Sequence, residues 1–302
     1  MAGCLWGTGF FFGKLALREM SVGHMVLYRF LFATLGMLPM MLTGRRSAGK
    51  SLSAEKKPSW TKGEIRILLL SAALGIPIQF LLQFEGLART TVSHASLMVG
   101  TMPVLLALGA TIFAGERLDW VGWLALTGST VGAALIVLGG HEAGTPGVAP
   151  SLGGDLLVVL SLMIALGWIL ANKSLMRRHG PLAVTAYGIL AGTAMLAIWV
   201  VAMDGPPPVA GISMTAWLAL GASGVLCTAT TTLLWNWGIH HVPASRAGVF
   251  LNIEPALGSL LGVELLGDKL GPFAWVGGGL ILAAAVTLTT RGQDFDPEVL
   301  LE

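Results

Sequence analysis

Glu254 is an acidic residue in the middle of an apolar stretch, FLNIEPALGSLL, and a proline follows it directly. If this stretch crosses a bilayer, a carboxylate near its centre costs roughly 3 kcal/mol, so we expect the side chain to face protein or water. There it could bind a substrate ammonium group or take up and release a proton. The alternative is structural: Pro255 interrupts the helix, and the carboxylate accepts hydrogen bonds from the interrupted backbone.

Polar and aromatic side chains recur at helical spacing in other apolar stretches. Gln79 and Gln83 are four residues apart and share one helix face, where their amides could hydrogen-bond amino and carboxylate groups without net charge. Trp168 and Asn172 have the same spacing, and Trp235 could add to an aromatic wall. Alternatively, the amides only join neighbouring helices, at about 0.6 kcal/mol per hydrogen bond, and the tryptophans lie at the membrane interface.

Three further residues are candidates for the same binding site. His94 begins an apolar stretch and could bind substrate or titrate near neutral pH, although a histidine with a purely structural role at a helix end is the alternative. Met98 could line the site, or simply pack in the core. Asn252 points about 200° away from Glu254 on a regular helix, so both reach one cavity only if the helix unwinds there.

Motifs of enzymes and metal sites are absent from the sequence. It contains no H-E-x-x-H, G-x-S-x-G, Walker A or dinucleotide-binding pattern. The adjacent His240 and His241 have no further residues at metal-ligand spacing, and the two cysteines are far apart. We therefore expect no enzyme activity, no cofactor and no metal. The net charge of +2 is too small to predict a nucleic-acid partner.

The composition indicates what kind of structure positions these residues. Of 302 residues, 54% are hydrophobic and only 11% are charged, whereas soluble domains have about 25% charged residues. This excludes a soluble globular enzyme and a disordered chain. A membrane-spanning helix needs roughly 20 apolar residues, and the sequence contains ten such stretches: 2–18, 22–43, 64–84, 91–113, 119–139, 154–172, 181–203, 212–237, 247–266 and 272–290.

Lysine and arginine are distributed unevenly between the two sides of the predicted spans. If the N-terminus is cytoplasmic, thirteen of these residues lie on the cytoplasmic side and four, namely Lys14, Arg18, Arg89 and Lys269, lie outside. Such a bias is typical of cytoplasmic loops. It predicts that both termini are cytoplasmic.

The two halves of the chain repeat one pattern. Residues 86–128 match residues 238–280 without a gap at an offset of 152 positions. Five spans per half is an odd number, so the second half would enter the membrane from the opposite side, an arrangement typical of secondary transporters and shared by some channels. The matches include a proline within a span, a glycine turn and a tryptophan: Pro103 and Pro255, Gly115 and Gly267, Trp123 and Trp275.

This repeat divides the chain into four parts. We expect a first five-helix repeat over residues 1–139, an external linker over 140–153, a second repeat over 154–291 and a cytoplasmic tail over 292–302. The fold class predicted is thus an all-α membrane protein, with ten transmembrane helices arranged as two inverted five-helix repeats around a central cavity.

Four segments resemble the ten-helix, EamA-type drug/metabolite transporter superfamily: LWGTGFFFGKLAL, LYRFLFATLGMLP, TMPVLLALGATIFAGERLDWVGWLAL and IEPALGSLLGVELLGDKLGPFAWVGG. Asp268 in the last segment departs from the usual glutamate. The resemblance implies alternating access, peripheral fifth and tenth helices and a place in the bacterial inner membrane. Arg29 lies in the family-like R-F segment. It could attract a carboxylate, but we expect a structural role.

Together these features predict a secondary transporter that exports small metabolites by alternating access. The expected cargo is an amino acid with an aromatic or other apolar side chain, because tryptophan content and cavity-region aromatics resemble an aromatic amino-acid exporter of the superfamily. Two alternatives stay open: an uncoupled uniporter or channel, and export of drugs, nucleosides or sugars by the same fold. The expected partners are a small-molecule substrate and the lipid bilayer, with the protein a monomer or weak homodimer.

Overall fold

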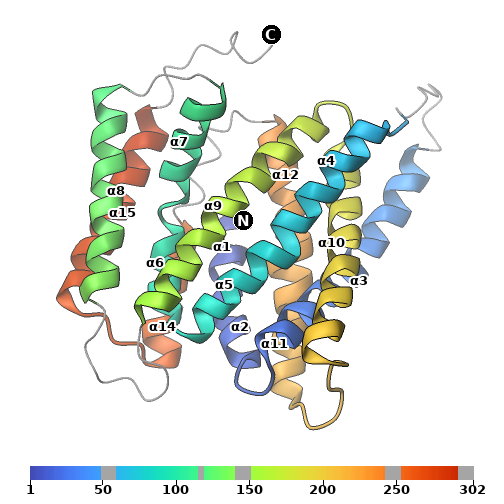
Figure 1. Ribbon diagram of the computed structural model, residues 1–302, viewed down its shortest axis with the longest axis horizontal. Coiled ribbons are helices and arrows are strands. Elements are labelled where there is room, and N and C mark those ends of the chain that lie inside the picture. The colour runs from blue at the N-terminus through green and yellow to red at the C-terminus, as the bar shows by residue number, and fades with distance from the viewer. Residues whose placement is uncertain (49–58, 115–118, 140–150, 242–252, 292–302) are drawn as a thin grey trace.

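A computed structural model describes residues 1–48, 59–114, 119–139, 151–241 and 253–291. The described residues form helices and no strand (Figure 1), which confirms the prediction of an all-α membrane protein. Five helical segments are long and apolar enough to cross a bilayer by length and composition: Val22–Pro39, Lys62–Ala88, Leu152–Met176, Pro181–Asp204 and Met214–Gly238.

Helices occupy part of each of the ten predicted ranges. In chain order they are α1 (Ala2–Gly7), α2 (Gly9–Ala16), α3 (Val22–Ala48), α4 (Lys62–Ala73), η1 (Leu74–Ile78), α5 (Gln79–Ala88), α6 (Val92–Val99), α7 (Met102–Ala114), α8 (Trp120–Gly139), α9 (Leu152–Met176), α10 (Pro181–Asp204), α11 (Met214–Gly224), η2 (Val225–Thr230), α12 (Thr231–His241), α14 (Ile253–Leu266) and α15 (Pro272–Arg291).

Two of the predicted spans are interrupted rather than continuous. Thr8 separates α1 from α2, and its hydroxyl donates to the Leu5 carbonyl at 2.8 Å. Thr101 separates α6 from α7 in the same way, with its hydroxyl 2.8 Å from the Met98 carbonyl. A threonine hydroxyl that bonds a carbonyl of the preceding turn competes with the regular backbone pattern. Apolar periodicity gave no sign of either break.

Two π-helical turns, η1 and η2, lie within otherwise regular helices. In η1 the cause is Pro77, which has no amide proton to donate. In η2 the hydroxyls of Thr228 and Thr231 donate to carbonyls five residues earlier, at 2.9 and 2.6 Å. An offset of 152 positions places residues 74–78 on 226–230, so the two turns occupy corresponding positions. Such turns occur frequently at functional sites.

Polar caps define where several helices begin. The Thr61 hydroxyl accepts the Glu64 amide, and the Glu64 carboxylate accepts the Thr61 amide at 2.8 Å, forming a capping box before α4. Ser213 caps α11. Its amide and hydroxyl also donate to Glu19 at 2.7 and 2.6 Å, which lowers the pKa of that exposed carboxyl. These hydrogen bonds tie the turn after α2 to the start of α11.

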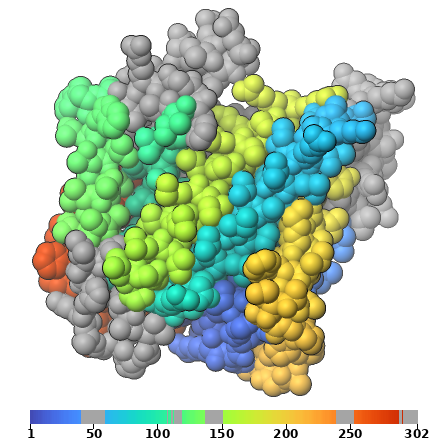
Figure 2. Space-filling model, in the orientation of Figure 1, coloured from blue at the N-terminus to red at the C-terminus, as the bar shows by residue number. Residues whose placement is uncertain are grey.

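The helices α8 and α15 lie side by side at one edge of the bundle (Figure 1). Glycines let their backbones approach closely: a methyl group on Gly132 would lie 2.6 Å from the Gly277 carbonyl oxygen. On the face shown in the space-filling view, α9 and the segment from α4 to α5 pack against each other across the middle of the molecule (Figure 2).

We expect Gly132→Ala to destabilise the protein by about 1–3 kcal/mol, because the added methyl group meets a neighbouring backbone that must move. Gly128→Ala is the matched control. A methyl group there meets no atom within 4 Å, and alanine favours the helix by up to about 1 kcal/mol. Thermal unfolding in detergent measures both. Equal melting temperatures for the two variants would contradict the close contact.

Candidate substrate-binding site

A cavity of about 1000 Å³, counting the space that opens to solvent, lies at the centre of the bundle. Its walls come from α1, α2, α3, η1, α5, α6, α7, α9, α10, η2, α12 and α14. Within the described ranges, α8 and α15 contribute no lining residue. Both halves of the chain therefore build one site, and α8 and α15 lie outside it.

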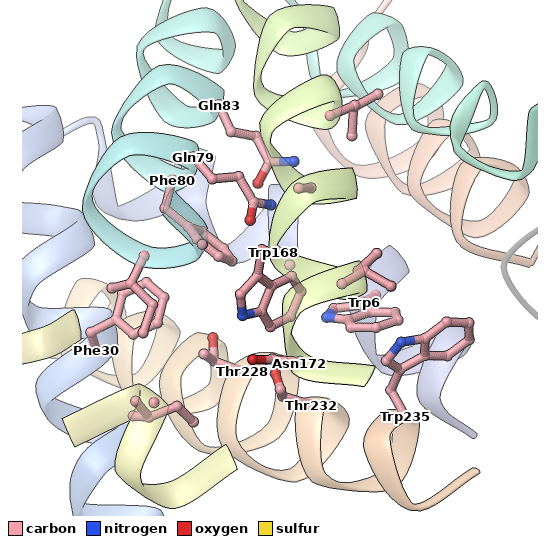
Figure 3. Close-up of a pocket in the computed structure, with 18 of the residues that line it drawn as sticks. Trp6, Phe30, Gln79, Phe80, Gln83, Trp168, Asn172, Thr228, Thr232 and Trp235 are labelled. Atoms are coloured by element: carbon pink, nitrogen blue, oxygen red, sulfur yellow. The ribbon is translucent and has the colours of Figure 1, made fainter. Parts of the chain in front are cut away.

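The two glutamines of α5 line this cavity. The side chains of Gln79, Gln83 and Trp168 point into the same space (Figure 3). Gln79 is only 6% exposed, and its Oε1 atom has no hydrogen-bond partner in the described part of the chain. An unpaired buried acceptor costs about 1–3 kcal/mol. A ligand that donates a hydrogen bond to Gln79 would remove this cost.

Aromatic rings form much of the wall. Trp235 packs against Trp6 with ring centroids 5.5 Å apart, and both line the cavity (Figure 3). The Nε1 atom of Trp235 is buried and, among the described residues, has no acceptor. Phe80 and Phe84 add two further rings, stacked at 6.2 Å. The wall therefore combines apolar surface with a few unpaired polar atoms, as small-molecule sites do.

Asn172 also lines the cavity, but its oxygen is already paired. It accepts the Ser71 hydroxyl at 2.7 Å and thereby joins α9 to α4. On the opposite side, the Asn236 amide donates to the Thr185 hydroxyl at 2.6 Å and joins α12 to α10. Asn172 thus contributes to helix packing as well as to the wall.

Arg29 reaches the cavity wall and is 3% exposed. Its Nε atom donates to the Thr228 hydroxyl at 2.7 Å and its Nη2 atom to the Cys227 carbonyl at 3.4 Å. The guanidinium carbon lies 4.9 Å from the ring centre of Phe80, a cation–π distance. We expected a structural role for Arg29; its hydrogen bonds join α3 to η2, and the residue also lines the candidate site. An arginine within an apolar span was the available signal.

Glu254 lines the same cavity. It attracts Arg29 electrostatically, but the two side chains do not form a direct ion pair in the described structure. The described residues also provide no hydrogen-bond donor to its carboxylate, so the structural alternative weighed from the sequence is not supported by a contact. The cavity therefore holds two separated groups of opposite charge.

His94 and Met98 are absent from the cavity wall in this structure. Both are fully buried on α6, which packs against α9 and α14. The His94 Nδ1 atom lies 3.3 Å from Asp155 Oδ2, and Asp155 also accepts the Thr90 hydroxyl at 2.6 Å. The acid that holds His94 lies 61 positions further along the chain, so local spacing could not reveal this pair. The predicted residue Asn252 lies outside the described residues.

Polar contacts close the bundle at the end where α5 finishes and α6 begins. The Lys14 ammonium donates to the carbonyls of Leu87 and Thr90, both at 2.7 Å. The Ser93 amide donates to Asp268 at 2.8 Å. With the His94–Asp155 pair, these contacts join α2, α5, α6, α9 and the residues after α14. We call this set the closing network.

The cavity extends toward the opposite end of the bundle. The lining residues of α9 lie mainly in the half that ends at Met176, and those of α10 lie in the half that begins at Pro181. Over the continuous segment from α11 to α12, Met214–His241, they lie in the half that ends at His241. These three helix ends lie at the upper edge of Figure 1. The closing network thus lies at one end of the bundle, and the lining residues of these helices lie toward the other end.

A cavity enclosed by the two halves of a helical membrane protein is typical of membrane transporters. The chain belongs to the EamA-like transporter family, whose model matches residues 1–138 and 152–290. A solved structure with a TM-score of 0.65 and 20% identity, covering 97% of this chain and 96% of its own, shares the fold. The chain is accordingly a transporter and not an enzyme.

Three relatives illustrate the family. An uncharacterized transporter of Archaeoglobus fulgidus is 24% identical over 96% of this chain and 94% of its own. A probable terminal-alkyne amino-acid exporter of Streptantibioticus cattleyicolor is 28% identical over 76% of this chain and 74% of its own. The uncharacterized inner membrane transporter YedA of Escherichia coli K12 is 25% identical over 94% of this chain and 87% of its own.

Proposed function

We propose that this transporter exports amino acids with apolar or aromatic side chains across the bacterial inner membrane by alternating access. The observation that carries the proposal is the wall of the central cavity. It combines aromatic rings with a guanidinium, a carboxylate and three amides, which are the groups that an amino acid needs for its side chain, its carboxylate and its ammonium. The name of the Streptantibioticus relative supports the same cargo class.

The proposed topology has ten spans in two inverted repeats, residues 1–139 and 154–291, with both termini cytoplasmic. Three observations support it: the family model matches each half separately, the π-helical turns η1 and η2 occupy corresponding positions, and lysine and arginine favour one side. In this orientation the closing network lies on the outer side and the cavity extends toward the cytoplasm, ready to receive a substrate for export.

Uptake into proteoliposomes tests the function. We expect saturable uptake of labelled phenylalanine, tryptophan or leucine. Uptake should increase when the vesicles contain the same amino acid unlabelled, because a carrier that has bound substrate inside reorients across the membrane faster than an empty one. Uptake that neither saturates nor responds to internal substrate would identify a channel. Uptake of no amino acid would overturn the proposed cargo and direct the search to drugs, nucleosides and sugars.

We expect Glu254→Gln to abolish the response of transport to a pH gradient. A carboxylate in the cavity can hold either a proton or a substrate ammonium group, and this competition would couple the two movements. The measurement is uptake at equal and at unequal pH across the vesicle membrane. Glu264→Gln is the control, because Glu264 lies exposed on the same helix. Gradient dependence like that of the wild type would remove Glu254 from the coupling step.

A further inference from the structure

We propose that Arg29 and Glu254 together recognise both charges of one zwitterionic substrate, with the carboxylate bound by Arg29 and the ammonium bound by Glu254. This assignment rests on the proposed function and deepens it. It predicts that the site requires both charged groups of an α-amino acid, so that amines and carboxylic acids with the same side chain bind poorly. Arg29 then determines the specificity for ligands with a carboxylate and does not only stabilise helix packing.

The first argument is the incomplete pairing of the Arg29 guanidinium. A guanidinium has five N–H donors, and the described structure pairs those of Nε and Nη2 with Thr228 and Cys227. The Nη1 atom, in the part of the chain that the structure describes, has no acceptor. Arg29 also lines the cavity. The contacts with η2 and the Phe80 ring hold the guanidinium in place, so a carboxylate could bind its remaining donors without reordering the side chain.

The second argument is the unpaired carboxylate of Glu254. It borders the cavity and accepts no hydrogen bond from a described residue. Glu254 is half-buried, and a charge that is partly withdrawn from water without a partner is unfavourable, so such sites normally provide a counter-charge. Arg29 attracts Glu254 electrostatically, but the two side chains are too far apart to form an ion pair. A substrate ammonium group would supply the missing partner. Gln79, with its unpaired Oε1 atom, could accept a hydrogen bond from the same ligand.

The third argument is the position of the two charges on either side of the break between α1 and α2. A methyl group on Gly7 would lie 3.1 Å from the Glu254 backbone carbonyl, and one on Gly9 would lie 3.7 Å from Arg29 Nη2. The break at Thr8 thus lets α1 and α2 pack closely against both charged residues. The two groups are near enough to attract each other and too far apart to pair directly, so a substrate with both charges can bind between them.

A ligand with one charge would leave the other protein group unpaired. Truncating one member of a buried charge pair typically costs 2–5 kcal/mol, which corresponds to about 30-fold or more in affinity. We therefore expect purified wild-type protein to bind phenylalanine at least about tenfold tighter than phenylethylamine or phenylpropionate. These two probes keep the aromatic ring and lack the carboxylate or the ammonium group, respectively.

Two variants assign each charge to its residue. Arg29→Gln should bind phenylalanine no better than phenylethylamine, and its affinity for the amine should stay close to that of the wild type. Glu254→Gln should bind phenylalanine no better than phenylpropionate, with little change for the acid. The matched controls Arg66→Gln and Glu264→Gln remove exposed charges on α4 and α14 and should keep the wild-type preference. Equilibrium binding to the detergent-solubilised full chain measures all of them.

Several outcomes would overturn the assignment. Equal binding of the three probes by the wild type would show that the site does not recognise the carboxylate or the ammonium group of the ligand. Equal losses for phenylalanine and the amine in Arg29→Gln would show that Arg29 only maintains the structure. If Arg29→Gln fails to fold, Arg29→Lys keeps the positive charge without the fork of donors and should weaken phenylalanine but not phenylethylamine. If the wild type takes up no amino acid, the proposed cargo is wrong. If it takes up amino acids but binds the three probes equally, only the assignment to Arg29 and Glu254 is wrong.

Discussion

Gly188→Leu is expected to reduce transport by about tenfold or more while leaving the protein folded. Gly188 lines the cavity, and a Cβ atom added there would meet no atom within 4 Å. The leucine can therefore enter the space in which the substrate binds, without displacing a neighbouring helix. Leucine also favours a helix over glycine by about 0.8 kcal/mol, so the melting temperature should not fall. Loss of transport together with retained stability is characteristic of a blocked site.

The control for this experiment is Gly221→Leu. Gly221 lies in α11 and does not line the cavity, and a Cβ atom added there likewise meets no atom within 4 Å. We expect wild-type uptake for this variant. Proteoliposome uptake and thermal unfolding are measured on both proteins. Uptake by Gly188→Leu at the wild-type rate would show that the substrate does not pass through this cavity, whatever its chemical class.

Lys14→Met is expected to favour the conformation that is open at the end of the bundle where the closing network lies. It removes two hydrogen bonds from a charged donor, to the carbonyls of Leu87 and Thr90. Hydrogen bonds to charged groups contribute about 1.5–3 kcal/mol each, and 1.4 kcal/mol is a factor of about ten in an equilibrium. If alternating access requires these contacts to break, their removal shifts the population toward the state open at this end.

Labelling of a cysteine in the cavity measures this shift. With Cys4 replaced by serine, Gln83→Cys is a reporter on the cavity wall, while Cys227 is buried. A membrane-impermeant maleimide added outside intact cells should label the reporter about tenfold faster when Lys14→Met is present. Lys269→Met, an exposed residue just after Asp268, is the control. Equal labelling rates in the two variants would show that Lys14 does not hold this end closed.

Helical periodicity was sufficient to predict part of the site. Gln79 and Gln83 share a face because residues four positions apart always do, and a polar face in an apolar span must avoid lipid. The same reasoning applies to Trp168 and Asn172. All four line the cavity in the structure. That the members of each pair share a helix face followed from the local geometry of one helix alone. Whether the four residues bind a substrate stays a prediction.

The pairing of distant residues was beyond the reach of this reasoning. Arg29 was assigned a structural role, and only the folded chain places it beside Thr228 and at the cavity. His94 was assigned to the binding site, although it lies against Asp155, away from the cavity. A polar residue in an apolar span must face the protein interior. Whether that interior is a cavity or a packed interface depends on which helix lies opposite.

By itself, then, the sequence determined that the chain is a helical membrane protein, which residues share a helix face, and that the two halves follow one pattern. The tertiary structure decided which of those faces meet, where α1–α2 and α6–α7 break, and that Arg29 and Glu254 border one cavity. The physical reason is that helix geometry is local and repeats every 3.6 residues. The rotation and neighbours of each helix are instead set by the packing of side chains far apart in the chain.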